Sequence, residues 1–170
     1  MSSSNTPQPA VAGLSASIFY RDPKAALAWL EKAFGFELKF LVLDDAGNLG
    51  HSTMAFGASE FSVNGEWEAP QMVGPARMRS PLAVEGINTQ FMRVHLTEDI
   101  EGHCERARAA GARITDEPQD QFYGSRTYRA LDPEGHVWTF DMPIAHVSED
   151  AIERGKQWTV RQAVRNSTEA

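Results

Sequence analysis

The chain of 170 residues carries a formal net charge of −7, with 23% charged and 42% hydrophobic residues. This length suffices for one domain with a buried core, or for two small modules that share one. The negative charge argues against nucleic acid or an anionic membrane as the main partner, and no apolar run approaches the roughly 20 residues that span a bilayer. A single cysteine, Cys104, excludes an intramolecular disulfide. Because the polar N-terminus lacks a secretory pattern, we expect a cytoplasmic protein.

The first half of the chain predicts one βαβββ module at residues 13–64, after a polar tail at residues 1–12 that we expect to be mobile. Asp22-Pro23 is typical of a helix start, because Asp caps the helix and Pro fits its first position. Gly35 is typical of a helix end. Alternating or apolar runs predict the strands of this module at residues 14–20, 36–43, 49–56 and 60–63.

The same pattern returns at residues 91–143. A helix from Asp99 to Gly111 corresponds to the one from Asp22 to Gly35, and strands are predicted around it at residues 91–96, 113–120, 121–131 and 136–141. An internal repeat of this size is the clearest architectural signal in the sequence. Residues 65–90 predict a long connection between the modules, and residues 144–170 predict a C-terminal helix and tail.

The stretch from Tyr123 to Phe140, YGSRTYRALDPEGHVWTF, carries the most specific motif. It predicts two strands joined by a turn, in which Pro133 presets φ and Gly135 tolerates a positive φ. YG-x-R followed by DPEGH-x-W-x-F resembles the second half of the glyoxalase/bleomycin-resistance/dioxygenase proteins, the vicinal oxygen chelate (VOC) superfamily. Residues 99–114 resemble the helix that precedes this motif in the superfamily.

The resemblance implies an α+β fold in which two βαβββ modules place curved mixed sheets around a shared cavity. The two modules and their connection would then form a single VOC-like domain at residues 13–143. The resemblance also implies a homodimer, because two chains of this superfamily often complete the cavities between them.

In metal-using members of the superfamily, the ligands come from the first and last strand of each module. The resemblance places these positions at Ser15, Val63, Phe91 (or Met92) and Thr139. They do not make a divalent-ion site, which needs imidazole, carboxylate or thiolate donors. A register shift by one residue brings in Glu60 or Asn64 and Asp141, but no histidine on a first strand. We therefore expect no metal and no other cofactor.

Arg93 and His95 alternate with apolar residues on the strand that opens the second module. If the apolar residues face the helix, Arg93 and His95 face the cavity, where they would bind an anionic group or take part in acid–base chemistry. The alternative, that the two side chains meet solvent or a neighbouring loop, remains open.

Further candidates come from both modules. Trp67 lies between two glutamates in the long connection, where an aromatic ring suits a cationic or planar ligand. Arg126 and Tyr128 share one strand face. Cys104 lies on the apolar stripe of a helix and predicts a buried, inert thiol, whereas His103 is expected at the surface. The complete set of candidate ligand-binding residues is Arg93, His95, Trp67, Arg126, Tyr128, Ser17, Phe19 and Thr139.

The sequence thus favours a protein that binds a small organic molecule, such as an antibiotic or another planar compound, in the inter-module cavity without a metal. The alternative is a VOC-type enzyme, namely a lyase, isomerase or dioxygenase. Such an enzyme would use Arg93 and His95 without a metal, or would depend on a metal if the strand register differs. A third possibility is a vestigial cavity in a protein that serves assembly.

Overall fold

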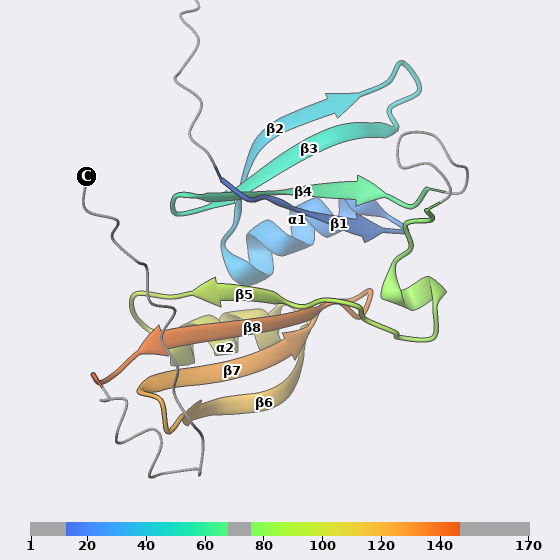
Figure 1. The fold of residues 1–170 in the computed structure, drawn as a ribbon. Coiled ribbons are helices and arrows are strands. Elements are labelled where there is room, and N and C mark those ends of the chain that lie inside the picture. Colours follow the sequence, from blue (N-terminus) through green and yellow to red (C-terminus); the bar gives the residue numbers. More distant parts are fainter. Residues whose placement is uncertain (1–12, 68–75, 147–170) are drawn as a thin grey trace, which may run out of the picture. The chain divides into compact units, whose positions relative to one another are not determined.

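The computed structural model describes residues 13–67 and 76–146, so the predicted C-terminal helix lies outside the described residues. The chain divides into two compact units, one made of Met1–Glu31 and Gly35–Arg79, the other of Lys32–Phe34 and Ser80–Ala170. Each unit contains one four-stranded sheet, and the elements follow the order βαβββ twice along the chain (Figure 1).

The sheet of the first unit is mixed, with the strand order β1-β4-β3-β2. Its first strand pairs in parallel with the last, whereas β2 with β3 and β3 with β4 are antiparallel. The elements from this part of the chain are β1 (Ala16–Tyr20), α1 (Pro23–Phe34), β2 (Glu37–Leu43), β3 (Leu49–Phe56) and β4 (Ser59–Gly65).

The ends of α1 follow from local chemistry, as the sequence predicts. The Asp22 carboxylate accepts a hydrogen bond from the Ala25 backbone N–H at 3.0 Å, which satisfies one of the free donors of the first turn. Gly35 has a φ of 73°, in the left-handed region that only glycine adopts easily, and its N–H donates to the Glu31 carbonyl. Both predicted helix boundaries are therefore confirmed.

The second unit repeats the topology with the strand order β5-β8-β7-β6, in which β5 and β8 are parallel. Its elements are the short 3₁₀ helix η1 (Pro81–Ala83), β5 (Met92–His95), α2 (Ile100–Ala109), β6 (Arg113–Asp120), β7 (Ser125–Leu131) and β8 (Val137–Pro143). The strand predicted at residues 121–131 begins only at Ser125. A tight turn precedes it, in which Gly124 has a φ of 86° and donates to the Gln121 carbonyl.

The turn of the DPEGH motif is organised by one buried carboxylate. Oδ1 of Asp132 accepts hydrogen bonds from the backbone N–H groups of Glu134 and His136, both at 3.0 Å, and Oδ2 accepts one from Nε1 of Trp138 at 3.1 Å. Gly135 has the positive φ of 89° that closes this turn. The motif therefore fixes the β7–β8 hairpin and the orientation of a buried tryptophan, which is a structural role.

Within residues 13–67 and 76–146, no helix combines the length and apolar character needed to cross a bilayer.

Candidate functional site

The two faces of the second sheet differ in chemistry. One face packs on α2 and is apolar: β7 and β8 pair so that Tyr128 lies opposite Phe140 and Ala130 lies opposite Trp138, and all four residues are fully buried. Phe34, which belongs to the same unit, contacts the rings of Trp138 and Phe140. This face is the core of the unit.

The opposite face is polar across three neighbouring strands, because side chains alternate between the two faces of a strand. The strand register aligns two rows on this face, one that joins Arg93, Thr139 and Arg129 and one that joins His95, Asp141 and Thr127. We call these six residues the polar face. Thr127, Thr139 and Asp141 are buried, whereas the side chains of Arg93 and His95 are 46% and 71% exposed.

Asp141 lies at the centre of the polar face. Its carboxylate oxygen Oδ2 is 2.9 Å from Nδ1 of His95, and Oδ1 is 3.8 Å from Nε of Arg93. The residue is only 5% exposed, and Oδ1 has no hydrogen-bond partner among the residues that the structure describes. The buried carboxylate of Asp141 thus lies close to both exposed side chains, those of Arg93 and His95.

The polar face brings together three of the eight predicted ligand-binding residues, Arg93, His95 and Thr139. The sequence analysis named Asp141 only as a substitute in a shifted register, and so missed it as a partner of His95. Its signal was present, because Asp141 follows Thr139 by two residues on a strand and therefore shares its face.

Arg126 and Tyr128 lie on the other face of the sheet. Tyr128 is fully buried, and its hydroxyl is 2.6 Å from Nδ1 of His103, so burial raises the pKa of the tyrosine. Arg126 forms ion pairs with Glu101 on α2 and with Asp120 on β6. Because both side chains point to the helix side, we leave them out of the candidate site.

His103 is buried rather than at the surface, so the sequence prediction for this residue was wrong. Its exposed fraction is 6%, and its Nε2 donates to the Phe34 carbonyl at 3.1 Å while its Nδ1 accepts from Tyr128. Burial lowers the pKa of His103 from its ordinary 6.5 to about 4. The helical spacing of the buried residues Ile100, His103, Cys104 and Ala107 is the signal that places it in the core.

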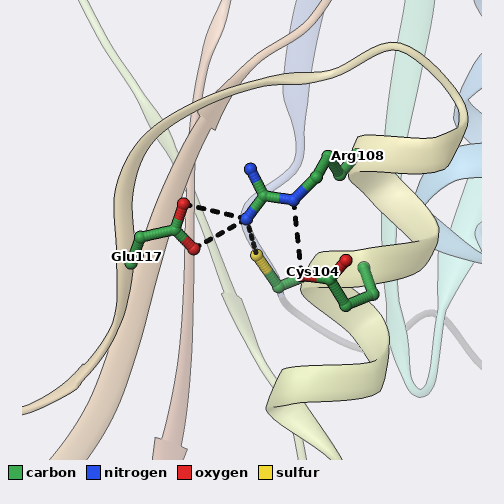
Figure 2. Close-up of polar contacts among 4 residues, drawn as sticks. Cys104, Arg108 and Glu117 are labelled. Carbon is green, nitrogen blue, oxygen red and sulfur yellow. Dashed lines mark hydrogen bonds and ion pairs between the residues drawn. The ribbon is translucent and has the colours of Figure 1, made fainter.

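Cys104 is buried, as predicted, and its surroundings oppose a nucleophilic role. Burial raises the pKa of the thiol to about 11, so little thiolate forms at neutral pH. Arg108 lies 3.9 Å from the sulfur, but its guanidinium group is engaged by Glu117 at 2.7 and 2.9 Å and by Glu105 at 3.3 Å (Figure 2). This cluster ties α2 to β6.

The remaining candidates, Ser17, Phe19 and Trp67, belong to the first unit. Ser17 and Phe19 alternate with the buried Ile18 and Tyr20, so they lie on the face of β1 away from the core. The ring of Phe19 meets that of Trp67 edge to face at 5.3 Å between centroids. The first unit therefore presents an aromatic pair at this end of its sheet. The shared cavity with the second unit stays a prediction.

The positions that the superfamily uses for metal ligands do not fit a metal ion here. Val63 lies on the core face of β4 beside the buried Ile18, so the predicted register is wrong by one residue there, and the opposite face holds Ser62 and Asn64. Phe91 has no donor atom. The Ser15 hydroxyl donates to the Glu60 carbonyl, and Thr139 offers only a buried hydroxyl. Within the described ranges, no group of three or more His, Cys, Asp or Glu residues is arranged to hold an ion.

Comparison with known proteins places the fold in a family. Residues 13–140 match the Glyoxalase/Bleomycin resistance protein/Dioxygenase superfamily. The chain belongs to this superfamily, and its two βαβββ modules with mixed four-stranded sheets confirm the predicted α+β architecture.

Two relatives are uncharacterized proteins, Mb0911c of Mycobacterium bovis and Rv0887c of Mycobacterium tuberculosis. Each is 29% identical over 141 residues, which is 82% of this chain and 89% and 79% of the two relatives. Among solved structures, TioX from Micromonospora sp. ML1 is 26% identical with a TM-score of 0.59, over 78% of this chain and 100% of its own. The fosfomycin resistance protein FosX from Mesorhizobium loti is 12% identical with a TM-score of 0.51, over 78% and 93%, and shares the fold alone.

Proposed function

We propose that this protein binds a small organic molecule with an anionic group on the polar face of its second unit, without a metal ion. The observation that carries the proposal is the pair of exposed side chains, Arg93 and His95, beside the buried carboxylate of Asp141. Structures seldom bury a carboxylate oxygen without a hydrogen bond unless the site has a further role.

The chemistry of the polar face favours an anion. Arg93 offers a planar fork of N–H donors that matches a carboxylate or phosphonate group. The other guanidinium group of the face, that of Arg129, is 3.4 Å from Asp116 on the neighbouring strand. Arg93 is 3.8 Å from Asp141 through Nε, and its side chain is 46% exposed, so its guanidinium group is accessible to a ligand. The net charge of the chain is −7 and does not attract anions. The local positive charge of Arg93 is therefore what favours an anion at this face.

The organic part of the ligand would meet aromatic surface. The edge-to-face pair of Phe19 and Trp67 in the first unit is a surface of this kind. We propose, as the resemblance to the superfamily implies, that the ligand binds in a cavity between modules and that the protein is a homodimer.

Binding can be tested by NMR titration of the isotope-labelled protein with aromatic carboxylates, aromatic phosphonates and their neutral amides. We expect saturable shifts at the polar face for the anions and not for the amides. Arg93→Gln should weaken binding by roughly tenfold to a hundredfold, because a hydrogen bond to a charged group contributes about 1.5–3 kcal/mol.

Arg108→Gln is the matched control, since Arg108 lies on α2 at the other side of the sheet and pairs with Glu117. It should leave the affinity unchanged. Equal affinity in the Arg93→Gln variant, or no saturable shift with any of the anions, would refute the proposal.

A VOC-type enzyme remains the second candidate. The observation that favours it is the hydrogen bond between His95 and Asp141, which is an arrangement suited to proton transfer. A lyase or isomerase that uses these residues fits the donor set better than a metal-dependent dioxygenase, because the superfamily's metal positions hold no suitable ligands.

A further inference from the structure

The hydrogen bond between His95 and Asp141 determines which nitrogen of the imidazole carries the proton. An ionised carboxylate only accepts hydrogen bonds, so Nδ1 of a neutral His95 must be the donor over the 2.9 Å to Oδ2 of Asp141. Nε2 then has no hydrogen and is an acceptor. Because the His95 side chain is 71% exposed, this acceptor is open to a bound molecule.

We propose that Asp141 is a positioning residue that makes Nε2 of His95 a general base, for a substrate whose carboxylate or carbonyl oxygen is held by Arg93. The inference rests on the proposed function, because the same face must first bind the molecule. It adds a reaction class, proton abstraction from a carbon next to that carboxylate or carbonyl group.

The step is balanced without any cofactor. The C–H bond breaks, its proton moves to Nε2 of His95, and its electron pair remains on the substrate as an enolate. The negative charge on the enolate oxygen is stabilised by the guanidinium group of Arg93. Return of the proton to the same or a neighbouring carbon restores His95, so the outcome is hydrogen exchange or isomerisation.

The second carboxylate oxygen supports the role of Asp141. Oδ1 is buried without a hydrogen-bond partner in the described part of the chain, and Nε of Arg93 is 3.8 Å away. An unsatisfied buried acceptor is costly, so a small movement of Arg93 that closes this distance is favourable. Asp141 would then hold Arg93 through Oδ1 and His95 through Oδ2, with the Nη atoms and Nε2 directed to one substrate.

The first test measures the tautomer of His95 in the wild-type protein by ¹⁵N NMR, at a pH where the ring is neutral. We expect the Nδ1–H form to predominate. Exposed neutral histidines in water favour the Nε2–H form, so the exposed His51 provides an internal reference. A predominant Nε2–H form at His95 would overturn the proposal, and this result does not depend on any variant.

The second test uses Asp141→Leu, which removes the acceptor, and Asp120→Leu as the matched control, which removes a carboxylate that pairs with Arg126 on the other face of the sheet. Acylation of histidine by diethyl pyrocarbonate is followed by mass spectrometry of the modified peptides. We expect His95 to react several-fold more slowly in Asp141→Leu and unchanged in Asp120→Leu, with His51 constant throughout. Equal rates at His95 in a folded Asp141→Leu protein would overturn the proposal.

The two proposals fail separately. Absence of anion binding with the Nδ1–H tautomer in place would refute the proposed function, whereas anion binding with the Nε2–H tautomer would refute the general base alone.

Discussion

At the scale of single residues, the buried histidine of α2 has the most definite consequence for stability. His103 donates through Nε2 to the Phe34 carbonyl and accepts through Nδ1 from Tyr128, so both ring nitrogens are satisfied only in the neutral state. Burial lowers the pKa of His103 to about 4. Protonation would replace an accepted hydrogen bond by a buried charge, which the folded protein resists.

The free energy of unfolding should therefore fall with acid. Because the folded pKa of about 4 lies below the ordinary 6.5, the contribution is fully present above pH 6.5 and is lost as the pH falls from there through 4. The shift corresponds to about 3 kcal/mol. Urea unfolding of the wild type and of His103→Gln at pH 7 and pH 4 measures it.

The His103→Gln variant lacks the titrating ring. Its free energy of unfolding should therefore decrease by about 3 kcal/mol less than that of the wild type between pH 7 and pH 4. The carboxylates that also titrate in this range are common to both proteins and cancel in the comparison. An equal acid dependence of the two proteins would show that His103 is not the buried base.

The sequence predicted the position of single residues correctly where the alternation along one strand determines which face of the sheet a side chain occupies. Arg93 and His95 were expected on the face opposite the helix, because Val94 and Leu96 alternate with them, and the structure places both apolar residues in the core. Tyr128 shows the limit of the same rule. The alternation along its strand predicted that Tyr128 shares a face with Arg126. It did not predict that this face packs on α2, because that contact depends on the tertiary fold.

At the scale of elements, the β7–β8 hairpin is held by the DPEGH turn rather than by its strands alone. Asp132 accepts three hydrogen bonds there, two from backbone N–H groups and one from the indole of Trp138. Asp132→Ala leaves these donors unsatisfied near the core, at about 1–3 kcal/mol each where water cannot reach them. We expect a loss of at least about 3 kcal/mol in the free energy of unfolding.

Chemical denaturation of Asp132→Ala, with the exposed turn variant Asp45→Ala as a control, measures this loss. The control should change stability by less than about 0.5 kcal/mol, because it removes a solvent-exposed side chain. If Asp132→Ala is as stable as the control, the motif does not hold the hairpin, and a direct role in ligand binding becomes the better explanation for it.

Element boundaries could be predicted where capping chemistry is explicit. The α1 helix begins after Asp22 and ends before Gly35, and both residues act through backbone hydrogen bonds that their side-chain types favour. The start of β7 was harder to predict, since the aromatic residues Phe122 and Tyr123 also favour a strand. The left-handed conformation of Gly124 turns the chain there, and a glycine also fits within a strand pattern.

At the scale of the whole chain, the internal repeat gives the same topology twice with different chemistry on corresponding strands. In β1 the residues that alternate with the core are Ser17 and Phe19, and in β5 they are Arg93 and His95. The arginine–histidine pair is thus confined to one repeat. The periodic pattern predicted both modules, but the shared cavity and the dimer depend on how the modules are placed, which no local pattern determines.

The same comparison bears on metal dependence, the property that separates metal-independent binding from a metal-dependent enzyme of this superfamily. A metal that binds the native state stabilises it by mass action, by about 2.7 kcal/mol at a metal concentration of 100 Kd. The melting temperature rises accordingly. The first-strand and last-strand positions hold Ser15, Ser62 or Asn64, Phe91 and Thr139, which lack imidazole, carboxylate and thiolate donors.

We therefore expect the melting temperature of the purified protein to be the same with EDTA and with added Ni²⁺, Zn²⁺, Mn²⁺ or Fe²⁺, and elemental analysis to find no stoichiometric metal. Stoichiometric metal with a higher melting temperature in the wild type would contradict metal-independent binding. The general base would then have to be sought among residues around that ion, because a bound cation changes the charge of every neighbouring group.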